Sequence, residues 1–260
     1  MPFTIAHAAA VLPFSRPLAR VRLLSAALIG SMAPDFGWFM PWRPARFETH
    51  GAISLFTFCL PVGLAVYWIF QRLIKPPLIE LLPPGAYGRW REWSAPADYA
   101  SLRQWILAGC GVLGGAITHL VWDAFTHEGA RGVRMIPALD DQAFSIGGLH
   151  LAGARLLQDA NSLAGLIIVA AILAYGLRPG SGVESGPRRL RSGERRAWIG
   201  VYVLAAAILS GLFFLMKHPA PRNLSVPVSS AAIAILRGLA AALLGVSLCL
   251  NVRLRDARRR

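Results

Sequence analysis

Three ionisable side chains recur at every fourth position in the segment GGAITHLVWDAFTH, residues 114–127: His119, Asp123 and His127. On an α-helix, residues four apart lie on the same face, about 6 Å from each other along the axis. His119 and Asp123 can therefore hold one metal ion between them. His127 lies about 12 Å from His119 along a straight helix, too far to share that ion. Either the helix ends near Thr126, or there are two ions with Asp123 between them.

Three further residues of the same chemical kind lie nearer the N-terminus. His7 ends the segment FTIAH, Asp35 follows Pro34 in GSMAPDF, and His50 ends ETH just before an apolar run. Proline disfavours helix in the residue before it, so we expect Asp35 at a break in the chain. Imidazole nitrogens and carboxylate oxygens without thiolates suit zinc, manganese or iron in a hydrolytic site. We predict a divalent transition metal, with zinc preferred, bound as one or two ions.

Apolar segments of membrane-spanning length accompany these residues. The chain of 260 residues is 55% hydrophobic and 15% charged, whereas soluble domains carry about 25% charged residues. Roughly 20 apolar residues cross a bilayer as a helix. Five runs approach this length, and a weaker sixth is interrupted by Pro34 and Asp35. The five are Ala52–Phe70, Trp105–Asp123, Ser162–Leu177, Trp198–Met216 and Ala231–Leu250, and the sixth is Leu23–Met40.

This pattern predicts an all-α fold: a polytopic membrane helical bundle with five or six spanning helices. A short N-terminal helical segment is expected to pack against the bundle, because Leu23–Ala33 is too short to cross a membrane. We expect one integral-membrane domain over residues 1–260, in which residues 1–50 supply half of the candidate ligands. Burying histidine and aspartate in lipid costs several kcal/mol unless they are paired or ligated, so such residues mark a function.

The net charge of +14 is distributed unevenly along the chain. Arginines concentrate between the first and second runs, in residues 178–197, and in the tail 251–260. This is the positive-inside pattern, and it places the linker 178–197 and the C-terminus in the cytoplasm and the candidate ligands on the outer side. A nucleic-acid-binding patch would instead lie on a folded soluble domain, so we expect no nucleic-acid partner.

The order of the motifs resembles that of a known family. MPFT-x2-H, GS-x2-PD-F, TH and G-x2-TH-x2-WD-x2-TH look like the DUF4184 family of bacterial membrane proteins. That family is similar to inner-membrane metal-dependent hydrolases of the DUF457 type, and both resemble zinc-dependent phospholipase C in the order of ligands. The resemblance implies a multi-pass protein of the bacterial inner membrane. It also implies six metal ligands: His7, Asp35, His50, His119, Asp123 and His127.

Roles within this set follow from the same resemblance. Asp35 and Asp123 are the expected catalytic carboxylates, and Asp35, at the chain break, is the expected bridging ligand or base. The chain departs from zinc phospholipase C in the spacing of its last histidine and in having no later His-x3-Glu. The nearest pair four residues apart is Gln158 and Ser162, which we expect to line the site or bind substrate. One or two ions are therefore expected rather than three.

The expected function is that of a membrane-bound metal-dependent hydrolase that uses metal-activated water. Its substrate would be a phosphodiester or ester of a membrane lipid or other amphiphile. Arg237 in the last apolar run either extends its charged end toward the membrane surface or pairs structurally, and its alternative role is to contact that substrate. One alternative is a non-enzymatic scaffold, in which a structural metal or a polar His/Asp group holds helices together. A transporter is the third alternative, although it should show repeated broken helices and only the break at Pro34 is found. The oligomeric state stays open.

Overall fold

We describe the protein from a computed structural model. It describes residues 4–259, except residues 41, 43, 84, 91–92, 94, 96, 141–143, 147–148, 152, 179–189 and 218–227. Helix dominates this part of the chain, and within it five helices are long and apolar enough to cross a membrane. They are Leu55–Leu81, Leu102–Thr126, Gly153–Leu177, Ser192–Met216 and Ser230–Asp256. The predicted all-α, polytopic architecture is confirmed.

The weaker sixth run does not form a spanning helix. Residues 24–39 instead form α2 (Leu24–Gly30) and a 3-10 segment, η3 (Ala33–Phe39), with Pro34 in the first turn of η3. A proline is tolerated in a first turn, where its missing N–H has no helical partner to lose. The helical structure therefore breaks at residues 31–32, two residues earlier than the sequence predicted. Ala33 begins η3 and Asp35 lies within its first turn.

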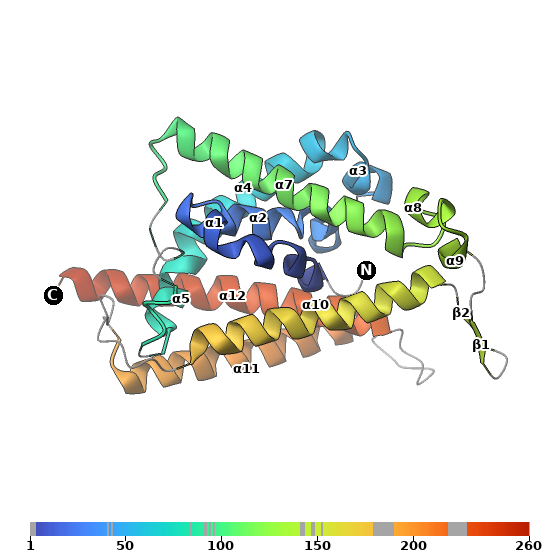
Figure 1. The fold of residues 1–260 in the computed structure, drawn as a ribbon. Coiled ribbons are helices and arrows are strands. Elements are labelled where there is room, and N and C mark those ends of the chain that lie inside the picture. The colour runs from blue at the N-terminus through green and yellow to red at the C-terminus, as the bar shows by residue number, and fades with distance from the viewer. Residues whose placement is uncertain are drawn as a thin grey trace. The chain divides into compact units, whose positions relative to one another are not determined.

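The other elements follow in chain order (Figure 1). Before α2 lie η1 (Thr4–Ala10), η2 (Leu12–Phe14) and α1 (Ser15–Arg20). After η3 comes α3 (Arg46–His50). The first spanning helix then consists, in order, of the π-helical stretch η4 (Leu55–Cys59), α4 (Leu60–Ile69), a second π-helical stretch η5 (Phe70–Ile74) and α5 (Lys75–Leu81). The second spanning helix is α7 (Leu102–Thr126). The C-terminal half holds α8 (Arg131–Arg134), α9 (Pro137–Asp140), β1 (Phe144–Ile146), β2 (Leu149–Leu151), α10 (Gly153–Leu177), α11 (Ser192–Lys217) and α12 (Val228–Arg259). The two strands pair antiparallel, with Ser145 opposite His150, in a loop where no strand was expected.

The sequence predicted one domain over residues 1–260, whereas the packing separates into two compact units. One unit lies within the ranges 3–65 and 98–173, and it carries all six candidate ligands. We call it the ligand unit. The other lies within 66–97 and 174–260. The Arg-rich linker 178–197 is described only from residue 190 onward and at residue 178, and the tail only up to residue 259.

The second unit is built mainly from α11 and α12, which pack against each other. The hydroxyls of Tyr202 and Ser247 are hydrogen-bonded at 2.5 Å between these helices. Asn251 on α12 donates to the carbonyl of Leu73 at 2.6 Å, which ties α12 to η5. Hydrogen bonds thus join the largely apolar helices of this unit, as they do in other membrane helical bundles.

The ligand unit is organised by the contact of α2 with α7 (Figure 1). Gly111 and Gly115, one turn apart on α7, face α2. A Cβ on Gly111 would lie 2.9 Å from the Ala26 Cβ, and one on Gly115 would lie 2.6 Å from the Ser31 backbone nitrogen. Small residues at this spacing let two helix backbones approach closely in a membrane protein. The same buried face of α7 continues to His119 and Asp123.

A small apolar core lies where α7 meets η3 and η4. Ala33 of η3, Cys59 of η4 and Ala116 of α7 are fully buried and in contact with one another. Phe36, Leu55 and Phe58 pack around them. Because these small side chains fill the junction, η3 and the start of the first spanning helix are both held against α7. This packing fixes Asp35 and the end of α3 beside the two ligand candidates on α7.

Candidate metal centre

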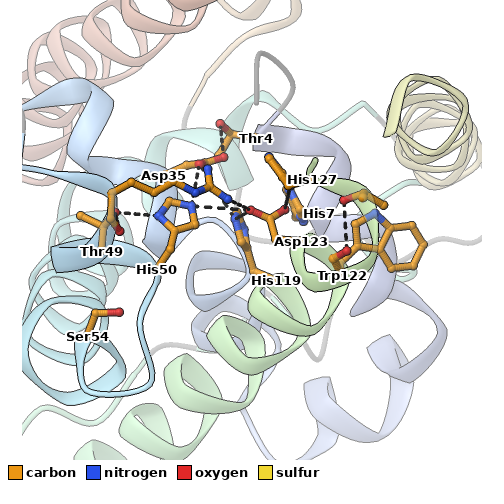
Figure 2. A network of polar contacts seen from close by, with 12 residues as sticks. Thr4, His7, Asp35, Thr49, His50, Ser54, His119, Trp122, Asp123 and His127 are labelled. Carbon is orange, nitrogen blue, oxygen red and sulfur yellow. Dashed lines mark hydrogen bonds and ion pairs between the residues drawn. The ribbon is translucent and has the colours of Figure 1, made fainter. Parts of the chain in front are cut away.

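All six predicted ligands come together in the ligand unit, and we call them the His/Asp cluster. They come from four separate parts of the chain: His7 from η1, Asp35 from η3, His50 from the end of α3, and His119, Asp123 and His127 from α7 and the residue after it. His7, Asp35, His50, His119 and Asp123 are buried, with side-chain exposures of 0–9%, and His127 is 18% exposed. Figure 2 shows the Asp35, His50, His119 and Asp123 side chains directed toward one another.

Asp123 lies at the centre of the His/Asp cluster. Its Oδ2 is 3.6 Å from Nε2 of His119 and 3.7 Å from Nε2 of His50. Its Oδ1 is 3.4 Å from Nδ1 of His127 and 3.8 Å from Nε2 of His7. Each carboxylate oxygen of Asp123 therefore faces its own pair of imidazole nitrogens.

Asp35 uses its two oxygens differently. Oδ1 lies 3.5 Å from Nε2 of His50 and 3.9 Å from Nε2 of His119. Oδ2 accepts a hydrogen bond from the Thr4 hydroxyl at 2.8 Å. Only one oxygen of Asp35 is thus directed at the imidazoles, while the other is held from outside by η1.

These separations are those of metal ligands rather than of hydrogen-bonded pairs. An N–H···O hydrogen bond spans about 2.7–3.2 Å, whereas the nitrogen-to-oxygen distances in the cluster are 3.4–3.9 Å. Two ligands of one tetrahedral zinc ion, each bound at about 2.0–2.1 Å, lie roughly 3.3–3.4 Å apart. Within the described part of the chain, five buried atoms here have no hydrogen-bond partner: Asp35 Oδ1, His50 Nε2, His119 Nε2, Asp123 Oδ1 and His127 Nδ1. Buried polar atoms are nearly always satisfied, so this donor set fits a cation.

A hydrogen bond at Nδ1 of His119 determines the tautomer of this ring, and therefore whether its Nε2, which faces the cluster, carries a lone pair. Nδ1 of His119 lies 2.8 Å from the carbonyl oxygen of Ser31. A carbonyl can only accept, so Nδ1 carries the hydrogen and the neutral ring has its lone pair on Nε2. Metal-binding histidines commonly donate their second N–H in this way, which fixes both tautomer and ring orientation.

His50 is oriented by a short relay along α3. Its Nδ1 lies 2.7 Å from the Thr49 hydroxyl oxygen, and this hydroxyl donates its own hydrogen to the Arg46 carbonyl at 3.3 Å. Since a hydroxyl has one hydrogen, Thr49 is left as the acceptor for Nδ1–H of His50. The neutral ring of His50 then also directs the lone pair of Nε2 at the two carboxylates. Glu48 supports the relay by accepting from the Ala45 backbone N–H at 2.6 Å, which fixes the first turn of α3.

Comparison with known families adds one finding to this geometry. The family model of DUF4184, a domain of unknown function, matches residues 1–248. The chain belongs to the DUF4184 family. No curated protein and no solved structure matches it.

The surroundings of this DUF4184 cluster favour neutral rings at His7 and His127 and an ionised carboxylate at Asp35. Burial, reinforced by the neighbouring His119, lowers the pKa of His7 to about 4. Burial also lowers the pKa of His127. Burial alone would raise the pKa of Asp35, but the neighbouring His50, His119 and Thr4 outweigh it and hold that pKa at about 2. These are the protonation states that a metal ion requires of its ligands.

One charged residue of the DUF4184 site was not predicted from the sequence. Arg46 donates from Nη2 to Oδ2 of Asp123 at 3.0 Å, and its side chain is 52% exposed. Thr4, Ser31 and Thr49 were also missed as supporting residues. The dipeptide Thr-His recurs three times, at 49–50, 118–119 and 126–127, but only Thr49 binds its histidine. Thr118 and Thr126 instead donate to backbone carbonyls of their own helix.

Of the three predicted substrate residues, Gln158 and Ser162 belong to the ligand unit and Arg237 does not. Gln158 and Ser162 are buried on α10, two turns and one turn before Gly165, respectively. A Cβ on Gly165 would lie 2.8 Å from the Ala6 carbonyl oxygen, so this part of α10 packs near the segment that carries His7. Arg237 belongs to α12 in the other unit and is not part of the ligand unit.

Proposed function

We propose that this DUF4184 protein is a membrane-bound metal-dependent hydrolase whose His/Asp cluster binds one or two divalent transition metal ions, zinc being preferred. One observation carries the proposal: five buried nitrogen and oxygen atoms lie at ligand spacing without a hydrogen-bond partner among the described residues. Lone pairs facing lone pairs repel each other, and a shared cation removes that repulsion. A protein that needed only to join its helices would be better served by direct hydrogen bonds.

The distances suggest how the ligands divide. Asp35, His50 and His119 would hold one ion, because one ligand atom of each lies within 4.8 Å of the other two. Oδ2 of Asp123, 3.6 Å from His119 and 3.7 Å from His50, would join them. His7 and Asp123, which with His119 form a second such group, would hold a second ion, and His127, 3.4 Å from Oδ1 of Asp123, would be its third ligand. This division favours Asp123 over Asp35 as the bridging ligand, since Asp35 has one oxygen committed to Thr4.

The chain's own groups set the conditions for hydrolysis. When bound, a divalent transition metal supplies Lewis acidity, which polarises a phosphoryl or acyl oxygen and makes water more acidic. Asp35, with its pKa near 2, remains ionised and suits the role of ligand; a general base works best with a pKa close to the operating pH. His50 and His119 are pre-oriented by Thr49 and Ser31, so they need little rearrangement to bind an ion.

The position of the cluster supports a lipid-like substrate. His50 lies five residues before the first spanning helix begins, and Asp123 and His127 lie at the end of α7, so the ligands gather at one end of two spanning helices. That end corresponds to the head-group depth of a bilayer. Trp42 and Phe47 lie next to this region in sequence and are 71% and 80% exposed. An ester or phosphodiester of a membrane amphiphile would meet the cluster at this level.

We further propose a place in the bacterial inner membrane with the C-terminus in the cytoplasm, supported by the Arg-rich segments 178–197 and 251–260. Reporter fusions at Gly193 and Arg260 should both give cytoplasmic signals. An external signal at either position would reverse the side of the membrane that the cluster faces.

Hydrolysis and a purely structural metal are separated by a paired assay. Wild type and His119→Ala are assayed against a panel of phospholipids and generic phosphodiesters, with chelator and with added Zn²⁺ or Mn²⁺. We expect chelator to abolish turnover, added metal to restore it, and His119→Ala to be inactive. Equal background rates in both proteins over the whole panel would reject the hydrolase and leave the scaffold.

A further inference from the structure

Arg46 is a largely exposed residue whose guanidinium contacts the buried His/Asp cluster. Its side chain is 52% exposed, whereas its partner Asp123 is 6% exposed. Arg46 precedes His50 by four residues on α3, so one helix face presents both a ligand and a guanidinium. The Glu48 contact and the Thr49 relay hold the backbone of α3 in place. The guanidinium is therefore positioned by a fixed backbone, while its long side chain keeps access to solvent.

Most of the hydrogen-bonding capacity of Arg46 is left over. A guanidinium has five N–H donors in a planar fork. Within the described residues, its side chain makes one hydrogen bond, from Nη2 to Asp123 Oδ2. That oxygen also faces the imidazoles of His50 and His119, at 3.7 and 3.6 Å. The free end of the fork thus lies directly beside the atoms that would hold a metal ion.

The charges indicate what Arg46 would bind. The cluster contains two carboxylates, Asp35 and Asp123, and a single divalent cation balances both of them. Once such a cation is bound, the positive charge of Arg46 has no counter-charge within the cluster. A second divalent cation would add to the positive excess. The loaded site therefore attracts an anion, and a guanidinium fork matches the paired oxygens of a phosphoryl group.

We propose that Arg46 is a specificity-determining residue that binds an anionic phosphoryl group next to the metal-loaded cluster. This rests on the proposed function and narrows its substrate class: a phosphodiester or phosphomonoester is favoured over a neutral carboxylic ester. The phosphoryl group belongs either to a lipid head group or to a water-soluble phosphate, because the same contact serves both. Arg46 contacts the substrate itself, whereas the ligands contact the metal.

Binding measurements test this assignment without requiring turnover. Wild type, Arg46→Gln and Arg46→Lys are purified in a neutral maltoside detergent, loaded with Zn²⁺, and their metal content is measured by mass spectrometry. Inorganic phosphate and dihexanoyl phosphatidylglycerol are then titrated by calorimetry into each protein. Arg155→Gln is the matched control, because Arg155 is an exposed arginine of the same unit that pairs with the exposed Asp159.

We expect Arg46→Gln to retain metal and to bind at least one probe about 10- to 100-fold more weakly, the range for losing a charge-assisted hydrogen bond. Arg46→Lys should recover part of the loss, and Arg155→Gln should bind like wild type. Weakening for the lipid probe alone identifies a head-group site, and weakening for inorganic phosphate identifies a soluble one. Unchanged affinity for both probes in metal-loaded Arg46→Gln would overturn the assignment and leave Arg46 as an ion-pair partner of Asp123. Wild type that binds no metal would reject the proposed function, and this inference with it.

Discussion

Nδ1 of His119 and the carbonyl oxygen of Ser31 lie 2.8 Å apart although 88 residues separate them in the chain. The contact exists because α2 crosses α7 at Gly111 and Gly115, where no side chain keeps the two backbones apart. His119 is one turn beyond Gly115 on α7, so Ser31, the residue that follows α2, lies next to the ring of His119. The orientation of a candidate ligand thus depends on two glycines that never touch it.

The first prediction concerns this crossing. In Gly115→Ala the new Cβ would meet backbone atoms of α2, which cannot move aside as a flexible side chain would. We expect a loss of stability of about 1–3 kcal/mol, typical of overpacking, together with weaker metal binding as Ser31 moves away from His119. Thermal unfolding in detergent and metal content by mass spectrometry measure the two effects.

Gly114→Ala is the control for this experiment. Gly114 is the preceding residue on the same helix, and a Cβ there would meet nothing within 4 Å. Alanine favours helix over glycine by about 1 kcal/mol, so this variant should be unchanged or slightly more stable. If Gly115→Ala behaves like Gly114→Ala in both measurements, close packing of α2 is not what orients His119.

The second prediction concerns the division of the ligands. Asp123→Asn should lose all bound metal, because both of its oxygens face imidazoles. His50→Ala and His127→Ala should each remove one ion and leave the other, if two are bound. Each variant should also unfold at a lower temperature, since metal binding is coupled to folding. Cys110→Ala, at an exposed position of α7, should keep the wild-type metal content. Stoichiometry unchanged in all three ligand variants would contradict the division.

Much of this arrangement could be predicted from the sequence, for identifiable reasons. The spanning helices follow from the length of their apolar runs. His119 and Asp123 could be predicted to lie on one helix face, because residues four apart do so in any α-helix. Pro34 indicated a break near Asp35, and the structure places it at residues 31–32, with Ala33 already in η3.

The parts that could not be predicted depend on contacts between distant segments. Nothing in the local sequence of Arg46 indicates that it lies beside Asp123, 77 residues later. The sequence favoured Asp35 as the bridging carboxylate, since it lies at a chain break. The sequence could not show that its second oxygen accepts a hydrogen bond from Thr4, 31 residues earlier. Which oxygen is free is a property of tertiary packing, which spacing along one helix cannot show.

The third prediction tests the relay that orients His50. Thr49→Val keeps the shape of the side chain but removes the hydroxyl that accepts from Nδ1 of His50. Mutations of such outer-shell partners typically cost 10- to 100-fold in metal affinity, and we expect a loss in that range. Competition with a chelator of known affinity provides the measurement. Thr57→Val is the control, because its hydroxyl is exposed and donates to the carbonyl of Ile53, four residues earlier and away from the cluster's ligands. Equal affinities in the two variants would show that Thr49 does not orient His50.

The fourth prediction concerns pH and the metal-free protein. Burial, reinforced by His119, lowers the pKa of His7 to about 4 in the folded chain, whereas an unfolded histidine titrates near 6.5. Between these values the unfolded state binds a proton that the folded state does not. The contribution of His7 to the free energy of unfolding is therefore greatest above about pH 6.5 and falls as the pH drops toward 4, by up to about 1.4 kcal/mol per pH unit.

His7→Gln removes this titration, so its unfolding temperature should fall less than that of wild type between pH 7.5 and 5. Thermal unfolding of both chelator-treated proteins over this range measures the difference. Parallel curves would mean that His7 titrates normally, and that its ring is not held neutral by burial in the cluster.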